Sequence, residues 1–418
     1  MSKTRLNSEK TVHTSSLSKA CSILLSSALL AVCWASARAD VQNFAPESCD
    51  ISAGKFDLND VSFLYPLPAS ARDFDDLISM RSAGLGGDLV PQVAFDDFFN
   101  TTSSENVEAS RLVAARVDHC FPGDNGEGCI KQLRLVFQPV LEDADTGVVT
   151  TADTNVHTFY TFDDETFERL LHEFKNLKSL AGTATACKPL TVHPVMQQEG
   201  LKGAYAQKLK EIITRFAGEE NFDHSAQSFI LDPTTATTTR IFKQQDAAGN
   251  GIPIAGPNSR GGHVSAAVAQ NNVLVAMPMG PFQTRTELLW RLQNNTLFNG
   301  RPSQEEIENA VDETFILDNP LLSNAKTTDC FSCHLAGRVR PGIVNNTSIS
   351  LPDFVFANEY KNPAFDLTPT FNGLNIEQEK MFSYTMHIPS VNPRVIHESA
   401  EVAEALNRWQ NPSCSEPR

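Results

Sequence analysis

The stretch QLRLVFQPV, residues 132–140, decides how this chain folds. Leu133, Leu135 and Phe137 recur at every second position, which is the period of a strand that buries one face. EDADTG (142–147) then predicts a turn, and NVHTFYTF (155–162) predicts a second strand, so the two strands are expected to form a hairpin. The turn has a D-x-D-x-G pattern but lacks the remaining ligand spacing of a calcium loop, so we expect a solvated turn.

Two amphipathic helices are expected to follow this hairpin. DDETFERLLHEFKNLKSLAG (163–182) repeats large apolar side chains at helical spacing, with Asp163 or Asp164 at its start and Gly182 at its end. A second stripe runs through AYAQKLKEIITRFAG (204–218), which Gly218 is expected to close. Stripes of this kind are typical of faces that pack on a core rather than of cofactor contacts.

Further elements flank this region on both sides. DVSFLYPLPAS (60–70) indicates a strand that runs into a proline-limited loop, and GLGG (84–87) indicates a loop. The segments TTATTTRIFKQQ (234–245) and NNVLVAMPMG (271–280) indicate two more strands. Helices are expected at two places: 284–297 and 301–315.

This order of elements predicts an α+β fold in two domains. Residues 40–300 are expected to form a large mixed domain whose role the sequence does not indicate. Residues 301–418 are expected to form a small, mainly helical, loop-rich domain, with the boundary near Gly300.

Residues 1–39 have the pattern of an export signal. A basic lead precedes the apolar run CSILLSSALLAVCWA (21–35), and ARA (37–39) offers small residues before a cut at Asp40. The mature protein is therefore expected to be periplasmic or secreted. A retained membrane anchor is a weaker alternative because the run is short, and a lipoprotein modified at Cys33 is weaker because valine precedes that cysteine. No later stretch is long and apolar enough to span a membrane.

Removal of the signal makes the chain more acidic. The full chain has 34 basic and 50 acidic side chains, a formal charge of −16, and the signal carries five of the basic and one of the acidic ones. The mature chain therefore has 29 basic and 49 acidic side chains, a formal charge of −20. This charge repels nucleic acid and anionic membrane surfaces, and it is compatible with a basic protein partner.

Cysteine usage fits an oxidising compartment. Cys120 and Cys129 flank FPGDNGEG, which is rich in turn formers, so we expect a small loop closed by a disulfide. Outside the motif considered next, three cysteines remain in the mature chain: Cys49, Cys187 and Cys414. Two of these three are able to pair, and the sequence leaves the choice open.

The segment TTDCFSCHLAGR, residues 327–338, carries the chemistry. Two thiols separated by two residues, at Cys330 and Cys333, match the spacing at which thioethers form with the two vinyl groups of a porphyrin. His334, the next residue, is then placed to coordinate the iron. The motif therefore predicts one covalently bound haem c per chain.

Other interpretations of the motif are weaker. A structural zinc site needs a second Cys pair or a His pair, and an iron–sulfur cluster needs four thiolates in known spacings. A thioredoxin-like redox pair is typical of a βαβ context, which the flanking sequence does not suggest. A plain structural disulfide stays as the alternative.

Around this motif the chain resembles a monohaem c-type cytochrome. The resemblance covers only the C-terminal part, where CFSCH is followed by a long loop and then by MHIPSVNPRVIHESAEVAEALNRW (386–409). It implies that Cys330 and Cys333 are thioether attachments, that His334 is the proximal iron ligand and that Met386 is the distal one. It also implies a final helix that packs on the haem domain's core through these residues: Val402, Leu406 and Trp409.

The chain departs from that family at the distal position. The usual Met-Pro pair is replaced by Met386-His387-Ile388-Pro389. Met381, His387 and His397 therefore compete with Met386, as does an open site; Met381 otherwise fits a core residue and His397 a surface or helix-start residue. Two arginines after the motif are candidate contacts for haem propionates, with solvated surface arginines as the alternative: Arg338 and Arg340.

These features favour an exported monohaem cytochrome that transfers single electrons to a redox protein partner. The alternatives are a haem-containing sensory or ligand-binding protein and a peroxidase-like enzyme, although familiar exported cytochrome c peroxidases carry two such motifs. If no haem is bound, a disulfide-stabilised extracytoplasmic binding module remains. An electron carrier or binding protein is favoured over a catalyst, and no catalytic residue is predicted, because the other histidines lack partner spacings.

Overall fold

The computed structural model describes residues 54–101, 104–119, 130–231, 237–252, 263–269, 273–276, 304–323, 334, 357–368 and 382–410. The chain divides into two units, Met1–Phe44 and Ala45–Arg418, and every described residue belongs to the second unit. The predicted export signal, Cys120 and Cys129 lie outside the described residues, and so do the helix expected at 284–297 and the boundary expected near Gly300.

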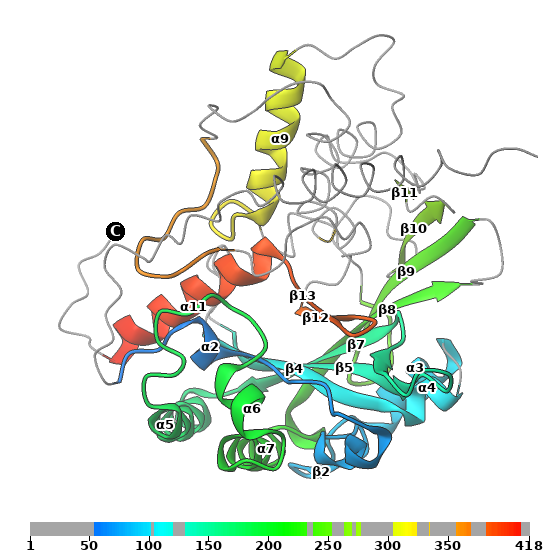
Figure 1. Cartoon of the computed structure of the whole chain (residues 1–418), viewed down its shortest axis with the longest axis vertical. Coiled ribbons are helices and arrows are strands. Elements are labelled where there is room, and N and C mark those ends of the chain that lie inside the picture. The colour runs from blue at the N-terminus through cyan, green and yellow to red at the C-terminus, as the bar shows by residue number, and fades with distance from the viewer. Residues whose placement is uncertain are drawn as a thin grey trace, which may run out of the picture. The chain divides into compact units, whose positions relative to one another are not determined.

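The architecture is α+β, as predicted, and its centre is one antiparallel sheet (Figure 1). Among the described residues the sheet has the strand order β1-β4-β5-β7-β8-β9-β10-β11, with β6 paired to the end of β5. The strands are β1 (Ser62–Leu64), β4 (Ser110–His119), β5 (Lys131–Glu142), β6 (Val149–Thr151), β7 (Asn155–Phe162), β8 (Phe222–Leu231), β9 (Thr237–Asp246), β10 (His263–Ala269) and β11 (Val273–Ala276). The predicted hairpin is confirmed, because β5 pairs with β7.

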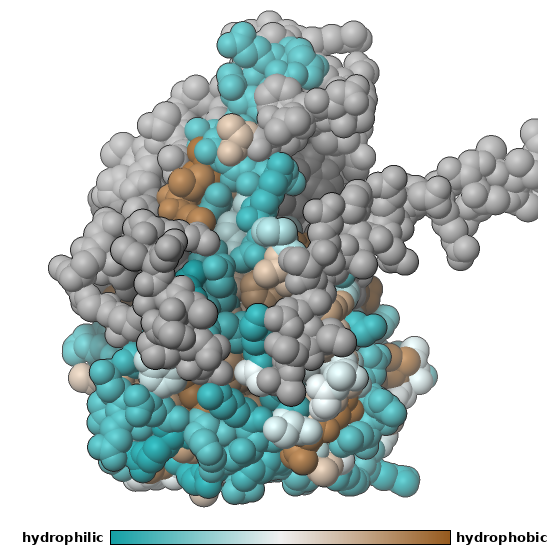
Figure 2. Space-filling model, turned by 90° about the vertical axis from the view of Figure 1, so that its left-hand side faces the viewer, coloured by the Kyte–Doolittle hydropathy of each residue, from teal (hydrophilic) through white to brown (hydrophobic). Residues whose placement is uncertain are grey.

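Helices cover one face of this sheet. Figure 1 shows α5 (Asp164–Ala181), α6 (Pro194–Glu199) and α7 (Ala204–Phe216) together on one side of it. The Asp163 side chain caps α5 by accepting a hydrogen bond of 2.7 Å from the Thr166 amide. The apolar stripes of α5 and α7 are buried, as predicted. Figure 2 shows a mainly hydrophilic outer surface over this part of the molecule. The described part of this half also contains five short helices: α2 (Leu58–Val61), η1 (Ala71–Asp76), α3 (Gln92–Thr101), α4 (Ser104–Glu108) and η2 (Glu219–Asn221).

The segment GLGG is not the plain loop that the sequence predicted but part of a short hairpin, β2 (Ala83–Gly84) and β3 (Gly87–Asp88). The hairpin lies against the end of α7, where the Leu85 amide donates to the Ala217 carbonyl over 2.9 Å. Ala217 is also the C-cap of α7, one residue before the predicted Gly218. A Cβ atom on Gly218 would lie 2.2 Å from the Leu85 nitrogen, so only glycine fits this approach of two backbones.

We therefore expect Gly218→Ala to lower the free energy of unfolding by about 1–3 kcal/mol, the usual cost of forcing packed atoms apart. Urea unfolding would measure the change, with Glu220→Ala as the control, because Glu220 is an exposed neighbour in the same link. Equal stability of Gly218→Ala and the wild type would show that the two backbones do not pack this closely.

The two faces of the sheet differ in chemistry. The face under α5, the helix face, presents apolar side chains that are fully buried: Leu133, Leu135, Phe137 and Tyr160. The opposite face, here called the polar face, presents the register-paired residues Arg116, Arg134, Phe159 and His224. Side chains alternate between the two faces along each strand, so the pairing fixes which residues share a face.

The C-terminal elements lie on the polar face. They are α9 (Gln304–Asp318), β12 (Phe382–Thr385), β13 (Ile388–Val391) and α11 (Pro393–Gln410), and α11 contacts β4 and the short helix α2 (Leu58–Val61). Described residues from both predicted domains belong to one hydrophobic core. Among the described residues, no helix combines the length and the apolarity that a membrane crossing requires.

The packing of α11 differs from what the cytochrome resemblance implied. Val402 and Leu406 are buried in the same core as Leu58 of α2. The Trp409 ring lies 5.7 Å from the His119 ring at the end of β4. This helix face therefore packs on elements from the N-terminal half of the chain, because α2 and β4 offer it apolar side chains.

Candidate functional site

His334 is the residue of the CFSCH motif that the structure describes, and it lies against the sheet. Its ring centroid is 4.8 Å from that of Phe242 in β9, with an angle of 54° between the planes. Phe242 is only 4% exposed, so His334 packs against a buried aromatic ring. This ring of Phe242 is here called the His334 platform. Cys330, Cys333, Arg338 and Arg340 lie outside the described residues, so their predicted roles stay predictions. Within the described ranges, no group of three or more potential metal ligands occurs.

The strand register shows that Phe242 belongs to the polar face. Asn155 of β7 pairs with Ser228 of β8, which in turn pairs with Phe242 of β9. On the opposite face, Gln227 and Lys243 both contact Asp97 of α3. Since Ser228 and Phe242 are the next residues along these strands, their side chains point the other way, toward the face that carries His334.

Met386 lies at the turn between β12 and β13, away from the His334 platform in the strand order. Its backbone is in the left-handed region with φ at 57°, and its side chain is 56% exposed. The Met386 carbonyl accepts hydrogen bonds from the Thr151 amide (2.9 Å) and from the Thr151 hydroxyl (2.8 Å). Gln138 of β5 donates to the Tyr384 carbonyl over 2.7 Å and accepts from the Tyr384 amide, so the turn is fixed over β5.

Between this hairpin and His334 lies a strip of the polar face that belongs to β7 and β8. We call it the floor strip and define it by four residues: Asn155, His157, Ala226 and Ser228. The strip separates β5 from β9 by three strand spacings, about 14 Å. Asn155 is 2% exposed, and its Oδ1 atom has no hydrogen-bond partner among the described residues. Most buried acceptors in folded proteins have a hydrogen-bond partner, so this atom is an exception.

A buried ionic network holds α11 to the polar face at β4. Arg116 of β4 donates to Asp118 (2.6 Å) and to Glu398 of α11 (2.5 Å). Glu398 also accepts from Arg394, one helical turn earlier, over 2.7 Å. Burial by itself would raise the pKa of Glu398, but Arg116, Arg394 and Arg134 outweigh burial and lower it to about 2. Glu398 is therefore an anion shared by the sheet and the helix.

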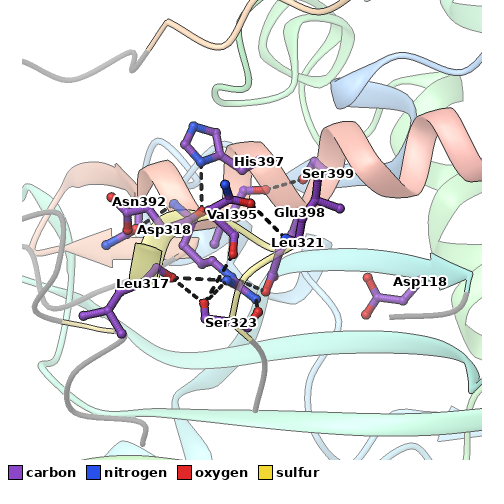
Figure 3. Close-up of polar contacts among 12 residues, drawn as sticks. Asp118, Leu317, Asp318, Leu321, Ser323, Asn392, Val395, His397, Glu398 and Ser399 are labelled. Atoms are coloured by element: carbon purple, nitrogen blue, oxygen red, sulfur yellow. Dashed lines mark hydrogen bonds and ion pairs between the residues drawn. The ribbon is translucent and has the colours of Figure 1, made fainter. Parts of the chain in front are cut away.

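Arg394 extends this network to the end of α9. Its guanidinium donates to the Leu317 carbonyl (3.1 Å), the Ser323 hydroxyl (2.6 Å) and the Ser323 carbonyl (2.8 Å). The segment that precedes the CFSCH motif is thus anchored to α11, and α11 is anchored to the sheet. Figure 3 shows the Leu317 and Ser323 contacts beside Glu398.

No family model, curated protein or solved structure matches this chain. Any function must therefore be argued from the residues of the site.

His397 is buried, so its interpretation as a surface residue is wrong, whereas its place near the start of α11 is as predicted. Its Nδ1 atom is 2.9 Å from the Asp318 carbonyl, and its ring lies 4.7 Å from the Tyr360 ring. The end of α9 covers it, a contact between residues 79 positions apart that local sequence does not reveal. His387 is exposed next to Met386, and Met381 lies outside the described residues.

Several groups that the fold brings together leave no local signal in the sequence. Arg116 and Asp118 are two residues apart on one strand, which signals only a shared face. Glu398, which pairs with Arg116, follows it by 282 residues. Cys187, one of the three leftover cysteines, is disulfide-bonded, and every other cysteine of the chain lies outside the described residues.

Proposed function

We propose that the protein is an exported monohaem c-type cytochrome that transfers single electrons. The CFSCH motif carries this proposal, supported by the position of its histidine against a buried aromatic ring of the sheet. Cys330 and Cys333 are the attachment residues, and His334 is the proximal ligand. The unpartnered Oδ1 atom of Asn155 on the floor strip fits a cofactor that covers this part of the face.

A haem bound here would supply a one-electron redox couple. The residues of the chain hold and orient the site. Phe242 restricts the His334 ring, and the sheet gives the site a rigid base. The network of Arg116, Glu398 and Arg394 fixes the segment before the motif. Rigid positioning of a ligand limits reorganisation when its charge changes, which suits an electron carrier.

The partner that fits this proposal is a basic redox protein. The mature chain would carry a formal charge of −20, which attracts a basic surface and accelerates encounter at low ionic strength. The compartment that fits is the periplasm or the outside of the cell, because haem c is attached after export.

A haem-containing sensory or ligand-binding protein is the second candidate. Asn155 favours it, because a buried amide oxygen beside a haem would accept a hydrogen bond from a small molecule bound at the iron.

The intact mass of the exported protein tests the proposal. We expect the mass of the chain from Asp40 onward plus one haem, together with a c-type haemochrome spectrum. The double variant Cys330→Ser/Cys333→Ser is expected to lose both signals, whereas Cys414→Ser, outside the motif, keeps them. A matured wild-type sample that weighs only as much as its polypeptide, without a Soret band, would contradict the proposal.

A further inference from the structure

Cys187 is disulfide-bonded, and the contacts of its loop indicate which cysteine is its partner. We infer that Cys187 pairs with Cys49, so that a covalent bond ties the N-terminal segment of the mature chain to the loop after α5. The two thiols give up two protons and two electrons to a protein disulfide of the oxidising compartment, which is reduced to a dithiol. This inference does not depend on the proposed function.

The loop that carries Cys187 is fastened to α2 on both sides of the cysteine. Before it, the Thr185 hydroxyl donates to the buried carboxylate of Asp60 over 2.8 Å. After it, the side-chain amide of Asn59 donates to the Pro189 carbonyl over 3.1 Å. The loop therefore has a fixed position beside α2.

The N-terminal end of α2 holds Cys187 itself. The Asp57 carboxylate, which caps α2, accepts a hydrogen bond of 2.6 Å from the Cys187 amide. Cys187 has a φ of 55°, in the left-handed region that residues other than glycine seldom adopt without such support. Cys49 precedes Asp57 by eight residues, a span of up to about 28 Å. The chain upstream of α2 is thus long enough to bring the two Cα atoms within the roughly 5–7 Å that a disulfide needs.

The described chain that leads toward Cys414 ends near the opposite end of α5. Trp409 packs on Phe167, with 6.3 Å between the ring centroids. Phe167 lies in the first turn of α5, whereas Lys178, which pairs with Asp60 of α2, lies in the last turn. About 16 Å of helix separates these two positions. Cys414 is therefore worse placed than Cys49 to reach the loop after α5.

Cys120 and Cys129 adjoin strand ends that lie at this same far end of α5. Cys120 directly follows His119, whose ring lies 5.6 Å from the Phe167 ring. Cys129 lies two residues before Lys131, which pairs with His119 across β4 and β5. Both cysteines therefore stand next to the first turn of α5 in the chain, and not next to α2.

The CFSCH motif is farther away still. Its His334 contacts β9, whereas α2 leads directly into β1. Five strand spacings, about 24 Å, separate β1 from β9 in the sheet. Pairing of Cys187 with Cys49 thus leaves Cys330 and Cys333 for the thioether bonds of the proposed function.

Peptide mapping of the exported wild-type chain, without reduction and with free thiols blocked, tests the inference. Trypsin places the candidate cysteines in separate peptides: Cys187 in 179–202, Cys414 in 409–418 and Cys49 in the peptide that ends at Lys55. We expect the peptide of Cys187 joined to that of Cys49, with two hydrogens less than the reduced pair. A link from 179–202 to 409–418, 117–131 or 327–338, or an unlinked 179–202, would overturn the inference.

Thermal unfolding provides a second measurement. Cys49→Ser and Cys187→Ser are each expected to lower Tm by about 3–6 °C, because the cross-link restricts a long loop of the unfolded chain. The double variant is expected to lose no more than either single variant. Cys414→Ser is the control, because Asn407 joins the end of α11 to Phe56 and makes Cys414 the nearest rival. A lower Tm in Cys414→Ser together with a wild-type Tm in Cys49→Ser would also overturn the inference.

Haem content separates this inference from the proposed function. Each of these serine variants is expected to keep the mass of one haem, because none of them changes the motif. A wild-type chain without haem would contradict the proposed function and leave the predicted link between the two peptides in place. A chain with haem but without this link would contradict only the inference.

Discussion

Replacing Glu398 with alanine is expected to lower the free energy of unfolding by about 3–5 kcal/mol, because the change breaks a buried ion pair and leaves the charges of its partners behind. Arg116 and Arg394 are both buried, and both direct a guanidinium N–H to Glu398. Without that carboxylate, Arg394 keeps its contacts to Ser323 but loses its ion pair with Glu398. Denaturant unfolding of the purified chain would measure the loss.

Two further variants show whether charge or shape is responsible. Glu398→Gln keeps the size of the side chain and removes its charge, so its effect is expected to be smaller than that of alanine but still large. Arg408→Ala, on the same helix, removes an exposed pair with Glu404 and is expected to cost at most about 0.5 kcal/mol. If Glu398→Ala costs no more than Arg408→Ala, this network does not hold α11 to the sheet.

Lowering the pH from 7 to 5 is expected to cost about 2 kcal/mol of stability through a single residue, His193. Burial lowers the pKa of this imidazole to about 3. Its side chain is fully buried between aromatic rings, with the Tyr205 ring 4.4 Å away and the Phe63 ring 5.8 Å away. Its Nδ1 atom accepts from the Met196 amide at the start of α6, which requires the neutral ring.

The sign of this effect follows from proton binding. Below about pH 6.5 the unfolded chain protonates His193, whereas the folded chain does so only near pH 3. The unfolded state therefore binds more protons throughout this window, and stability falls as the pH falls. Glu398 adds a separate loss at lower pH, between its ordinary value of 4.5 and about 2, where its carboxylate becomes protonated.

The measurement is urea unfolding at several pH values between 7 and 5. His193→Asn is expected to flatten the pH dependence, because asparagine can still cap α6 but cannot become charged. Its stability at pH 7 is expected to fall, since the ring packing is lost, so the slope and not the absolute value is the readout. His172→Asn removes an exposed imidazole as the control. A slope that His193→Asn leaves unchanged would show that another group controls the acid sensitivity.

Much of the fold could be predicted because its signals are local. The alternation of Leu133, Leu135 and Phe137 and the helical stripe of α5 depend on nearest neighbours along the chain, and both elements are confirmed. The short hairpin at GLGG was missed because its strands have two residues each and depend on packing against the end of α7.

The candidate site was predictable only as a motif. The CFSCH motif is recognised by the spacing of its residues, so Cys330, Cys333 and His334 could be named from the sequence as candidate site residues. Phe242, which packs against His334, had no such signal, because a single aromatic residue in a strand carries no information about what will lie against it. Met386 was favoured by order along the chain, and order along the chain does not fix which strand a turn lies over.

The sequence by itself determined which segments are strands and helices, which of their sides are apolar, and where the CFSCH motif stands. Only the tertiary structure decided that α11 lies on the polar face, that Glu398 meets an arginine 282 residues earlier, and that His334 rests on Phe242. The reason is physical: periodicity and spacing act between neighbours in the chain. Strand pairing and burial depend on residues that become neighbours only when the sheet has formed.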